Sequence, residues 1–477
     1  MRAILVLLLV AAFSCTHINN QATIVQFKIS KPLCVYTFLE TLLQRQATSH
    51  TFNQYIKKHT LPVDTAALNK IVADFANIDF GNATYNDKYP SERMRPDNIV
   101  VLLNKAVAQS DDINKMVIIN GLSQTEWAKL TVILKKAESY YDKIVWNNNR
   151  EAIYEQLKQL QKHASGLDGV FAKIKAFYGS DLPANKPFIL YLYPIPGRNG
   201  ESSATAYRDI LVMNMFTKEK NYFNYLSIAV HEMSHVLYQE QPPSLQFQLD
   251  STFNQSASAY APMAYNYIDE ALATACGNAW SYLILSGKPD TGSWYNNEVI
   301  NGYAHALYPS VEQYIKDGKH IDKTFIANAI GAYEKTFGDA INRYDNLLMS
   351  NHLFTDATDH AEFEYISNEV SRYYHVTSSW GSYPLLDAQS IEGIKTATGT
   401  QLFIIHTNNA ANINALKKLF PETKSIDPSK EMVVSFHDTQ NRAIIIINVK
   451  DKTRIADALQ LMKREKRIKN EMMMMIE

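Results

Sequence analysis

The sequence predicts an α+β protein built from three successive regions. Residues 16–185 follow a mainly helical pattern, residues 186–350 place apolar strand-like runs ahead of two long helices, and residues 351–477 alternate strands with helices. The chain has 477 residues, which exceeds the length of one ordinary hydrophobic core and predicts two or three domains. We therefore expect a helical amino-terminal region, a central core with a small mixed sheet, and a carboxy-terminal α/β module.

Residues 1–15 have the composition of an export signal. Met1 and Arg2 form a short positive start, residues 3–13 are apolar, and small residues follow up to Cys15. The apolar run is too short to span a bilayer, and its end fits a small-x-small cleavage pattern. It also resembles the lipobox of bacterial lipoproteins, in which Cys15 carries the lipid. We expect an exported chain that is secreted, periplasmic or anchored to the cell envelope through Cys15.

The charge balance and the cysteines limit the classes of partner and of fold. Lys and Arg total 47, Asp and Glu total 48, and the formal net charge is -1, so the chain has no basic field for nucleic acid. Cysteines occur only at positions 15, 34 and 276, which excludes a disulfide framework. We expect Cys34 and Cys276 to be buried thiols, and their pairing in an oxidising compartment is the alternative. A membrane partner is expected only through the anchor at Cys15.

Strands and helix starts mark the first half of the chain. A short strand is expected within residues 22–29. In the helical region, Ser123 and Glu126 form a capping box ahead of a helix, and residues 150–164 carry an apolar face. The pattern changes near residue 186, where we expect two buried strands at residues 187–193 and 209–215, with a hairpin or edge strand at residues 199–207 between them.

The first of two predicted helices carries chemically active side chains. It covers residues 221–239 and contains His231-Glu-Met-Ser-His235 among apolar neighbours. The spacing of four residues puts both imidazoles on one helical face, about one turn apart, where they can grip one tetrahedral ion. Glu232 projects beside them and is our candidate for the general base that activates a zinc-bound water.

The second helix, predicted over residues 262–286, supplies a third ligand. Glu270 follows His235 after a stretch that allows a turn and a returning helix. The small residues that let this helix approach the first one closely are Ala271, Ala273, Ala275, Gly277 and Ala279. Asp269 is the competing ligand, and Glu270 is preferred because its longer side chain suits ligation across two helices. We expect one Zn²⁺ per chain, held by His231, His235 and Glu270 with a fourth position open, which is the catalytic pattern.

These two motifs resemble those of the gluzincin group of zinc metallopeptidases. His231-Glu-Met-Ser-His235 is similar to their active-site helix and Asp269-Glu-Ala-Leu-Ala-Thr274 to their glutamate helix, and the resemblance covers about residues 186–310. It implies a zincin-like core, in which a small mixed sheet supports the two metal-bearing helices, and zinc-dependent hydrolysis of peptide bonds in a peptide or protein substrate. Gluzincins commonly orient a histidine with an acidic residue four positions after the ligand glutamate. Here that position is Thr274, so Asp269 or Asn278 has to orient a histidine instead.

The resemblance also implies groups that bind substrate. Related enzymes hold the substrate backbone along an edge strand, for which residues 203–207 are the candidate. They also stabilise the oxyanion with a donor opposite the metal. A segment similar to the substrate-binding segment of some thimet-type peptidases offers Tyr303, His305 and Tyr308 for this role, with Tyr303 and His305 preferred. An aminopeptidase needs an acidic group for the substrate amine, and Glu201 is the candidate.

Two other classes of function are compatible with the same residues. One is a degenerate zincin that acts as a non-catalytic, cell-surface protein binding peptide or glycan, and the intact motif at residues 231–235 argues against it. The other is a structural metal module with a fourth protein ligand, or a chance motif without metal. For the module at residues 351–477 we expect regulation or docking. Its histidines, His406 and His437, show no metal-ligand spacing and are interpreted as surface or structural residues.

Overall fold

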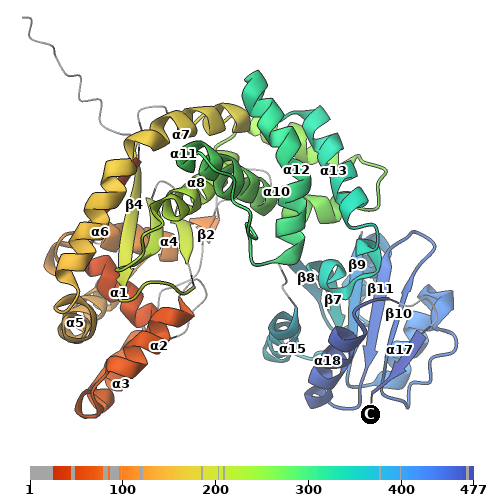
Figure 1. Cartoon of the computed structure of the whole chain (residues 1–477). Helices are drawn as coiled ribbons and strands as arrows, with labels where there is room; N and C mark the ends of the chain where they lie inside the picture. The colour runs from red at the N-terminus through yellow and green to blue at the C-terminus, as the bar shows by residue number, and fades with distance from the viewer. Residues whose placement is uncertain are drawn as a thin grey trace, which may run out of the picture.

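The computed structural model describes residues 25–43, 49–78, 84–85, 96–97, 99–117, 122–183, 186–201, 203–207, 210–374, 376, 378–397, 399–468 and 472–476. Within them the chain forms two lobes, each a mixed β-sheet with helices packed on it (Figure 1). This architecture is compatible with the predicted α+β class. The export signal expected at residues 1–15, with its lipid anchor at Cys15, lies outside the described residues.

The first lobe is built on a four-stranded sheet in the order β1-β4-β6-β5. The strands are β1 (Val25–Lys28), β4 (Phe188–Ile195), β5 (Ala204–Tyr207) and β6 (Ile210–Phe216). Strands β1, β4 and β6 run parallel, and β5 is an antiparallel strand at the edge. Strands β4 and β6 are buried along nearly their whole length, which accounts for their unbroken apolar sequences. The strands expected from the sequence are confirmed, including the edge strand.

Between β1 and β4 the chain is mainly helical, as predicted. The elements are α1 (Lys31–Leu42), α2 (His50–His59), α3 (Pro62–Ala76), β2 (Thr84–Tyr85), β3 (Pro96–Asp97), α4 (Ile99–Ala108), α5 (Gln124–Tyr141), α6 (Arg150–His163) and α7 (Ser165–Tyr178). Ser123 caps α5 by accepting a hydrogen bond from the backbone nitrogen of Glu126 at 3.1 Å. Because β1 precedes these helices and pairs with β4 after them, both sides of the expected boundary at 185/186 share one sheet and one hydrophobic core.

Long helices follow β6 and carry the metal candidates. They are α8 (Tyr222–Gln239), α9 (Pro243–Asn254), α10 (Ala261–Thr274), the π-helical segment η4 (Ala275–Ser281), α11 (Tyr282–Ser286), α12 (Glu298–Asp317) and α13 (Lys323–Thr336). The helix expected at residues 262–286 is confirmed as one helical run formed by α10, η4 and α11. Helices α8 and α10 pack against each other at the centre of the arch in Figure 1. Segments of π-helix are rare and are frequently found at functional sites.

The second lobe forms around a six-stranded sheet in the order β12-β10-β11-β9-β7-β8. Its elements are α14 (Tyr344–Leu347), β7 (Ser350–Thr355), α15 (His360–Tyr373), β8 (Ser378–Ser382), α16 (Ala388–Thr396), β9 (Thr400–Ile405), α17 (Asn409–Leu419), β10 (Met432–His437), β11 (Ala443–Asn448), α18 (Ile455–Glu465) and β12 (Met472–Met475). Strands β8, β7, β9 and β11 run parallel, and β10 and β12 extend the sheet in antiparallel fashion. Alternate residues of β11 enter two separate apolar clusters, so both faces of the sheet are covered.

The two cysteines among the described residues are free and buried. Burial raises the pKa of the thiols of Cys34 and Cys276 to about 12, so both behave as apolar core groups rather than as nucleophiles. Within the described part of the chain, no helix has the length and apolar character needed to cross a membrane.

Candidate metal centre

The metal candidates meet where α10 and η4 pack on α8. A β-carbon added at Gly277 of η4 would stand 2.5 Å from the backbone nitrogen of His231. No side chain fits at that separation, so glycine at this position lets the two helix backbones approach each other. Ala275 and Ala279 on either side are also buried. The close approach brings Glu270, on the same helical run, within reach of the histidines of α8.

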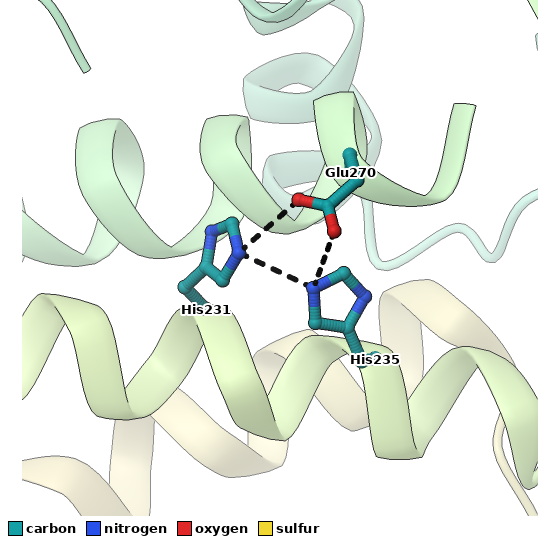
Figure 2. A group of neighbouring side chains, drawn as sticks. All are labelled: His231, His235 and Glu270. Atoms are coloured by element: carbon teal, nitrogen blue, oxygen red, sulfur yellow. Dashed lines mark hydrogen bonds and ion pairs between the residues drawn. The ribbon is translucent and has the colours of Figure 1, made fainter. Parts of the chain in front are cut away.

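His231, His235 and Glu270 converge on one point (Figure 2). The Nε2 atoms of the two histidines lie 3.2 Å apart. Oε2 of Glu270 is 3.5 Å from Nε2 of His231, and Oε1 is 3.6 Å from Nε2 of His235. At bond lengths of about 2.1 Å, neighbouring donors around a tetrahedral zinc ion stand about 3.4 Å apart. The three residues therefore already have the spacing of ligands around a single ion.

Asp269, the competing ligand, contacts the opposite side of the His235 ring. Its Oδ1 lies 3.1 Å from Nδ1 of His235. A carboxylate in this place fixes the orientation and tautomer of a ligating imidazole and increases its basicity. Glu270 thus completes the converging group, and Asp269 lies where a residue that orients a histidine would stand. Asn278, the other candidate for that role, donates from Nδ2 to the carbonyl oxygen of Trp294 instead.

The electrostatics of the group favour a bound cation. Burial acts to lower the pKa of His235, but the Asp269 carboxylate outweighs it and, with Glu270 and Glu232, raises this pKa to about 10. Burial acts to raise the pKa of Glu270, but a hydrogen bond from His231 and the charge of His235 lower it to about 2. The Glu270 carboxylate is therefore ionised, and positive charge is stabilised at His235 beside it, which is the environment that a divalent cation requires.

The donor set and one buried oxygen fit a zinc ion. Two imidazole nitrogens and one carboxylate oxygen form a set that Zn²⁺ uses in catalytic sites. Oε2 of Glu270 is buried and has no hydrogen bond of good geometry among the described residues. The side chains of His235 and Glu270 are 14% and 39% exposed, so the group opens to solvent on one side. This opening suits a site that keeps its fourth position for water or substrate.

Glu232 lies on α8 next to His231 and is half-buried. Its negative charge contributes to the raised pKa values of His235 on the same helix, of Tyr207 in β5 and of Tyr295. The carboxylate is therefore within electrostatic reach of the converging group and of the edge strand. This is the position that a general base beside the ion needs.

The structure corrects the expectation for Tyr303 and does not support the expectations for His305 and Tyr308. Tyr303 is fully buried, and its hydroxyl donates to the carbonyl oxygen of Ala329 at 3.1 Å, so it is a core residue that cannot reach a substrate. His305 is exposed and stacks on Trp294, with ring centroids 3.6 Å apart. The hydroxyl of Tyr308 donates a hydrogen bond to the Glu312 carboxylate. Among the described residues, none of the three has a recorded contact with His231, His235 or Glu270.

Tyr295 is the functional candidate that the sequence analysis missed. Its ring stacks on His231 with centroids 5.9 Å apart, and its hydroxyl lies close enough to Glu270 to lower the pKa of that carboxyl group. Burial, followed by the negative charge of Glu270, raises the pKa of Tyr295 well above its ordinary value, so the hydroxyl keeps its proton. Asn301 anchors the loop, since its Oδ1 accepts hydrogen bonds from the backbone nitrogens of Trp294 and Tyr295. The only sequence signal was an aromatic pair within a run of turn-forming residues.

The edge strand borders the site, whereas Glu201 has a structural partner. Strand β5 pairs with β6 on one side and packs beside α8. Oε2 of Glu201 accepts a hydrogen bond from the backbone nitrogen of His50 at 2.8 Å, at the start of α2. The carboxylate considered for binding a substrate amine is therefore engaged at a helix terminus.

Comparisons with known proteins give no further identification. No protein family, no characterised protein and no solved structure matches the chain. The functional argument therefore depends on the geometry and chemistry of the residues themselves.

Proposed function

We propose that this protein is an exported zinc metallopeptidase with a zincin-like core, in which His231, His235 and Glu270 hold one Zn²⁺ and Glu232 is the general base. The observation that carries the proposal is the convergence of the three ligand atoms on one point beside Glu232. The mixed sheet, with its antiparallel edge strand next to α8, supports the resemblance to gluzincins. The proposal of export depends on the composition of residues 1–15.

The chain's own residues supply the proton transfers. Zinc bound at this site would polarise the scissile carbonyl and lower the pKa of the attacking water. Glu232 is placed to take a proton from that water and to return it to the leaving amine nitrogen. Asp269 contacts Nδ1 of His235 and would keep the Nε2 atom of this ring free to ligate the metal.

Tyr295 is our candidate for the oxyanion donor in place of the three residues suggested by the sequence. Its hydroxyl is protonated and lies at the ligand carboxylate. From there it can donate to the negative charge that develops on the carbonyl oxygen of the substrate. Its stacking on His231 keeps the ring in place.

An extended peptide is the substrate class that the site favours. Among the described strands, β5 pairs with β6 alone, and the backbone groups of its other edge can pair with a substrate main chain. The small side chains of Ala204 and Ala206 lie along this strand. Main-chain pairing beside α8 would lay the scissile bond across Glu232 and the metal ligands.

Zinc content and the Glu232→Gln variant test the proposal together. We expect one zinc per chain by elemental analysis, together with cleavage of a mixed peptide library that a chelator abolishes. Glu232→Gln should keep the zinc, because Glu232 is not a ligand. Its kcat should fall about 10²- to 10⁴-fold, because the general base is lost. Glu240→Gln, at the end of the same helix, is the matched control and should stay active. Absence of zinc from the native protein would overturn the metal centre, and full activity of Glu232→Gln would overturn the mechanism.

A further inference from the structure

The second lobe contacts the helix that carries Glu270. Tyr267 lies three residues before Glu270 on α10, and its hydroxyl donates to Oδ1 of Asn346 at 3.3 Å in a buried setting. Asn346 belongs to α14, the first helix of the second lobe. Met263, one turn earlier on α10, packs against the apolar clusters of both lobes. The second lobe therefore touches α10 on the two turns that lead to the metal ligand.

The segment around Asn346 is itself fastened to the far end of the chain. Four contacts join it to β10 and to the residues in and after α18. They are Tyr344 N to Lys466 O at 3.1 Å, Ile468 N to Asn342 O at 2.7 Å, the Tyr344 hydroxyl to Ser435 Oγ at 2.6 Å, and the ion pair of Lys463 with Asp345. Because these contacts come from both the sheet and the last helix, Asn346 moves with the second lobe as one unit.

The ring of Tyr267 is fixed by packing within the first lobe. Its ring stacks on Tyr333 with centroids 6.1 Å apart, and Tyr333 in turn meets Tyr303 edge-on at 5.0 Å. Burial raises the pKa of Tyr267 to about 12, so the hydroxyl keeps the proton that it donates to Asn346. A fixed donor on α10 thus meets a fixed acceptor on the second lobe.

We propose that the second lobe positions the metal centre by holding α10 through the bond between Tyr267 and Asn346. The inference rests on the proposed zinc site and gives a role to the second lobe, which α14 joins to the metal-bearing helices. A shift of α10 would change the distance of Glu270 from both histidines, and metal ligands must be held to about 0.5 Å. Tyr267 and Asn346 touch neither ion nor substrate, so both are positioning residues.

The zinc dissociation constant, measured by competition with a chelator, tests this role without requiring activity. Tyr267→Phe and Asn346→Ala should each weaken zinc binding about tenfold, the lower range for outer partners of a metal site. The double variant should bind zinc no more weakly than either single variant, because both remove the same bond. Tyr303→Phe is the matched control: it removes a buried hydroxyl bond from another tyrosine that packs on Tyr333, and should leave zinc affinity within about twofold while costing similar stability.

The outcomes separate this inference from the proposed function. Native zinc affinity in both variants, with the native protein binding one zinc, would overturn the positioning role. The positioning role would also be overturned if Tyr267→Phe and Tyr303→Phe lost the same amount of zinc affinity at matched unfolding midpoints. That result would indicate a general loosening of the core. Absence of zinc from the native protein would instead overturn the metal centre itself.

Discussion

Each lobe holds a histidine between two carboxylates, yet the two clusters differ in what they can bind. At the metal centre, donor atoms from two helices point to a common position that opens to solvent. In the second lobe, Nδ1 of His406 is 2.7 Å from Asp356, and Nε2 is 3.1 Å from Glu362. These carboxylates lie on opposite sides of the ring, so they share the imidazole and leave no common centre for an ion.

The Asp356 carboxylate of the second cluster is also engaged by several hydrogen-bond donors. Asp356 accepts from the backbone nitrogens of His406 and Thr407, from the Thr407 hydroxyl and from the side chain of Asn412. The cluster therefore ties the end of β7 to the end of β9, and the interpretation of His406 as structural is confirmed. Residue type alone does not make a metal site. Among the described residues, convergence of the donor atoms on one point distinguishes the first cluster from the second.

Removing one carboxylate from each cluster should give the largest contrast. Glu270→Ala takes away a ligand and should weaken zinc binding by more than about 100-fold, beyond the usual effect of outer partners. Glu362→Ala should keep native zinc affinity and lower the midpoint of urea unfolding. Calorimetric zinc titration and urea unfolding of both variants measure the contrast, and similar zinc affinity in the two variants would refute the distinction between the clusters.

A smaller effect, on kcat alone, is expected from removing the hydroxyl of Tyr295. Tyr295→Phe removes the hydroxyl but keeps the ring on His231, so zinc should stay bound while kcat falls by about 10²-fold through the loss of an oxyanion donor. Tyr308→Phe, which removes an exposed hydroxyl from α12, should leave kcat unchanged. Steady-state kinetics of both variants on one peptide measure the difference. A lower kcat for Tyr308→Phe, together with a native kcat for Tyr295→Phe, would restore the expectation drawn from the sequence.

The smallest effect is a pH dependence that belongs to the second cluster. Burial acts to lower the pKa of His406, but hydrogen bonds to Asp356 and Glu362 raise it above its ordinary 6.5. A hydrogen bond from the backbone of Thr358, followed by one from His406, lowers the pKa of Glu362 below its ordinary 4.5. His406 stabilises the fold fully below pH 6.5, and this contribution is lost as the pH rises through its raised pKa. Glu362 stabilises the fold fully above pH 4.5, and this contribution is lost as the pH falls through its lowered pKa.

The cluster therefore contributes most to stability between pH 4.5 and 6.5. Urea unfolding midpoints of the native protein should be highest in this window and decline on either side relative to His406→Gln, which cannot titrate. Parallel pH profiles of the two proteins would show that the cluster adds nothing. Zinc affinity of His406→Gln should remain native, which again separates the two clusters.

Local sequence patterns predicted the helices of the metal centre. They could not predict which residues distant in the sequence fold next to these helices. The spacing of His231 and His235 and the helix around Glu270 are local features, so these residues and their helices were found. Tyr295 was missed because it lies in a loop with no period, and only folding brings it to His231. Tyr303 was misplaced although its buried neighbours Ile300, Ala304 and Leu307 recur at helical spacing, a pattern that indicates a core-facing residue.

The boundary expected at residues 185/186 depended on local pattern in the same way. The change of pattern near residue 186 is real, because helices give way to strands there. A change of secondary structure does not mark a separate core, however, when an early strand returns to the same sheet. A short strand such as β1 gives no sequence signal of its partner.

Val25 and Phe188 are partners in the parallel pairing of β1 with β4. A ribosome therefore delivers helices α1 to α7 before the strand that lies beside β1 has been made, and the apolar residues of β1 have no sheet to join during that time. Parallel pairing over such a separation is slow and exposes aggregation-prone surface. Under the export proposed above, the chain would cross the membrane unfolded and close its first sheet on the far side, after β6 has arrived.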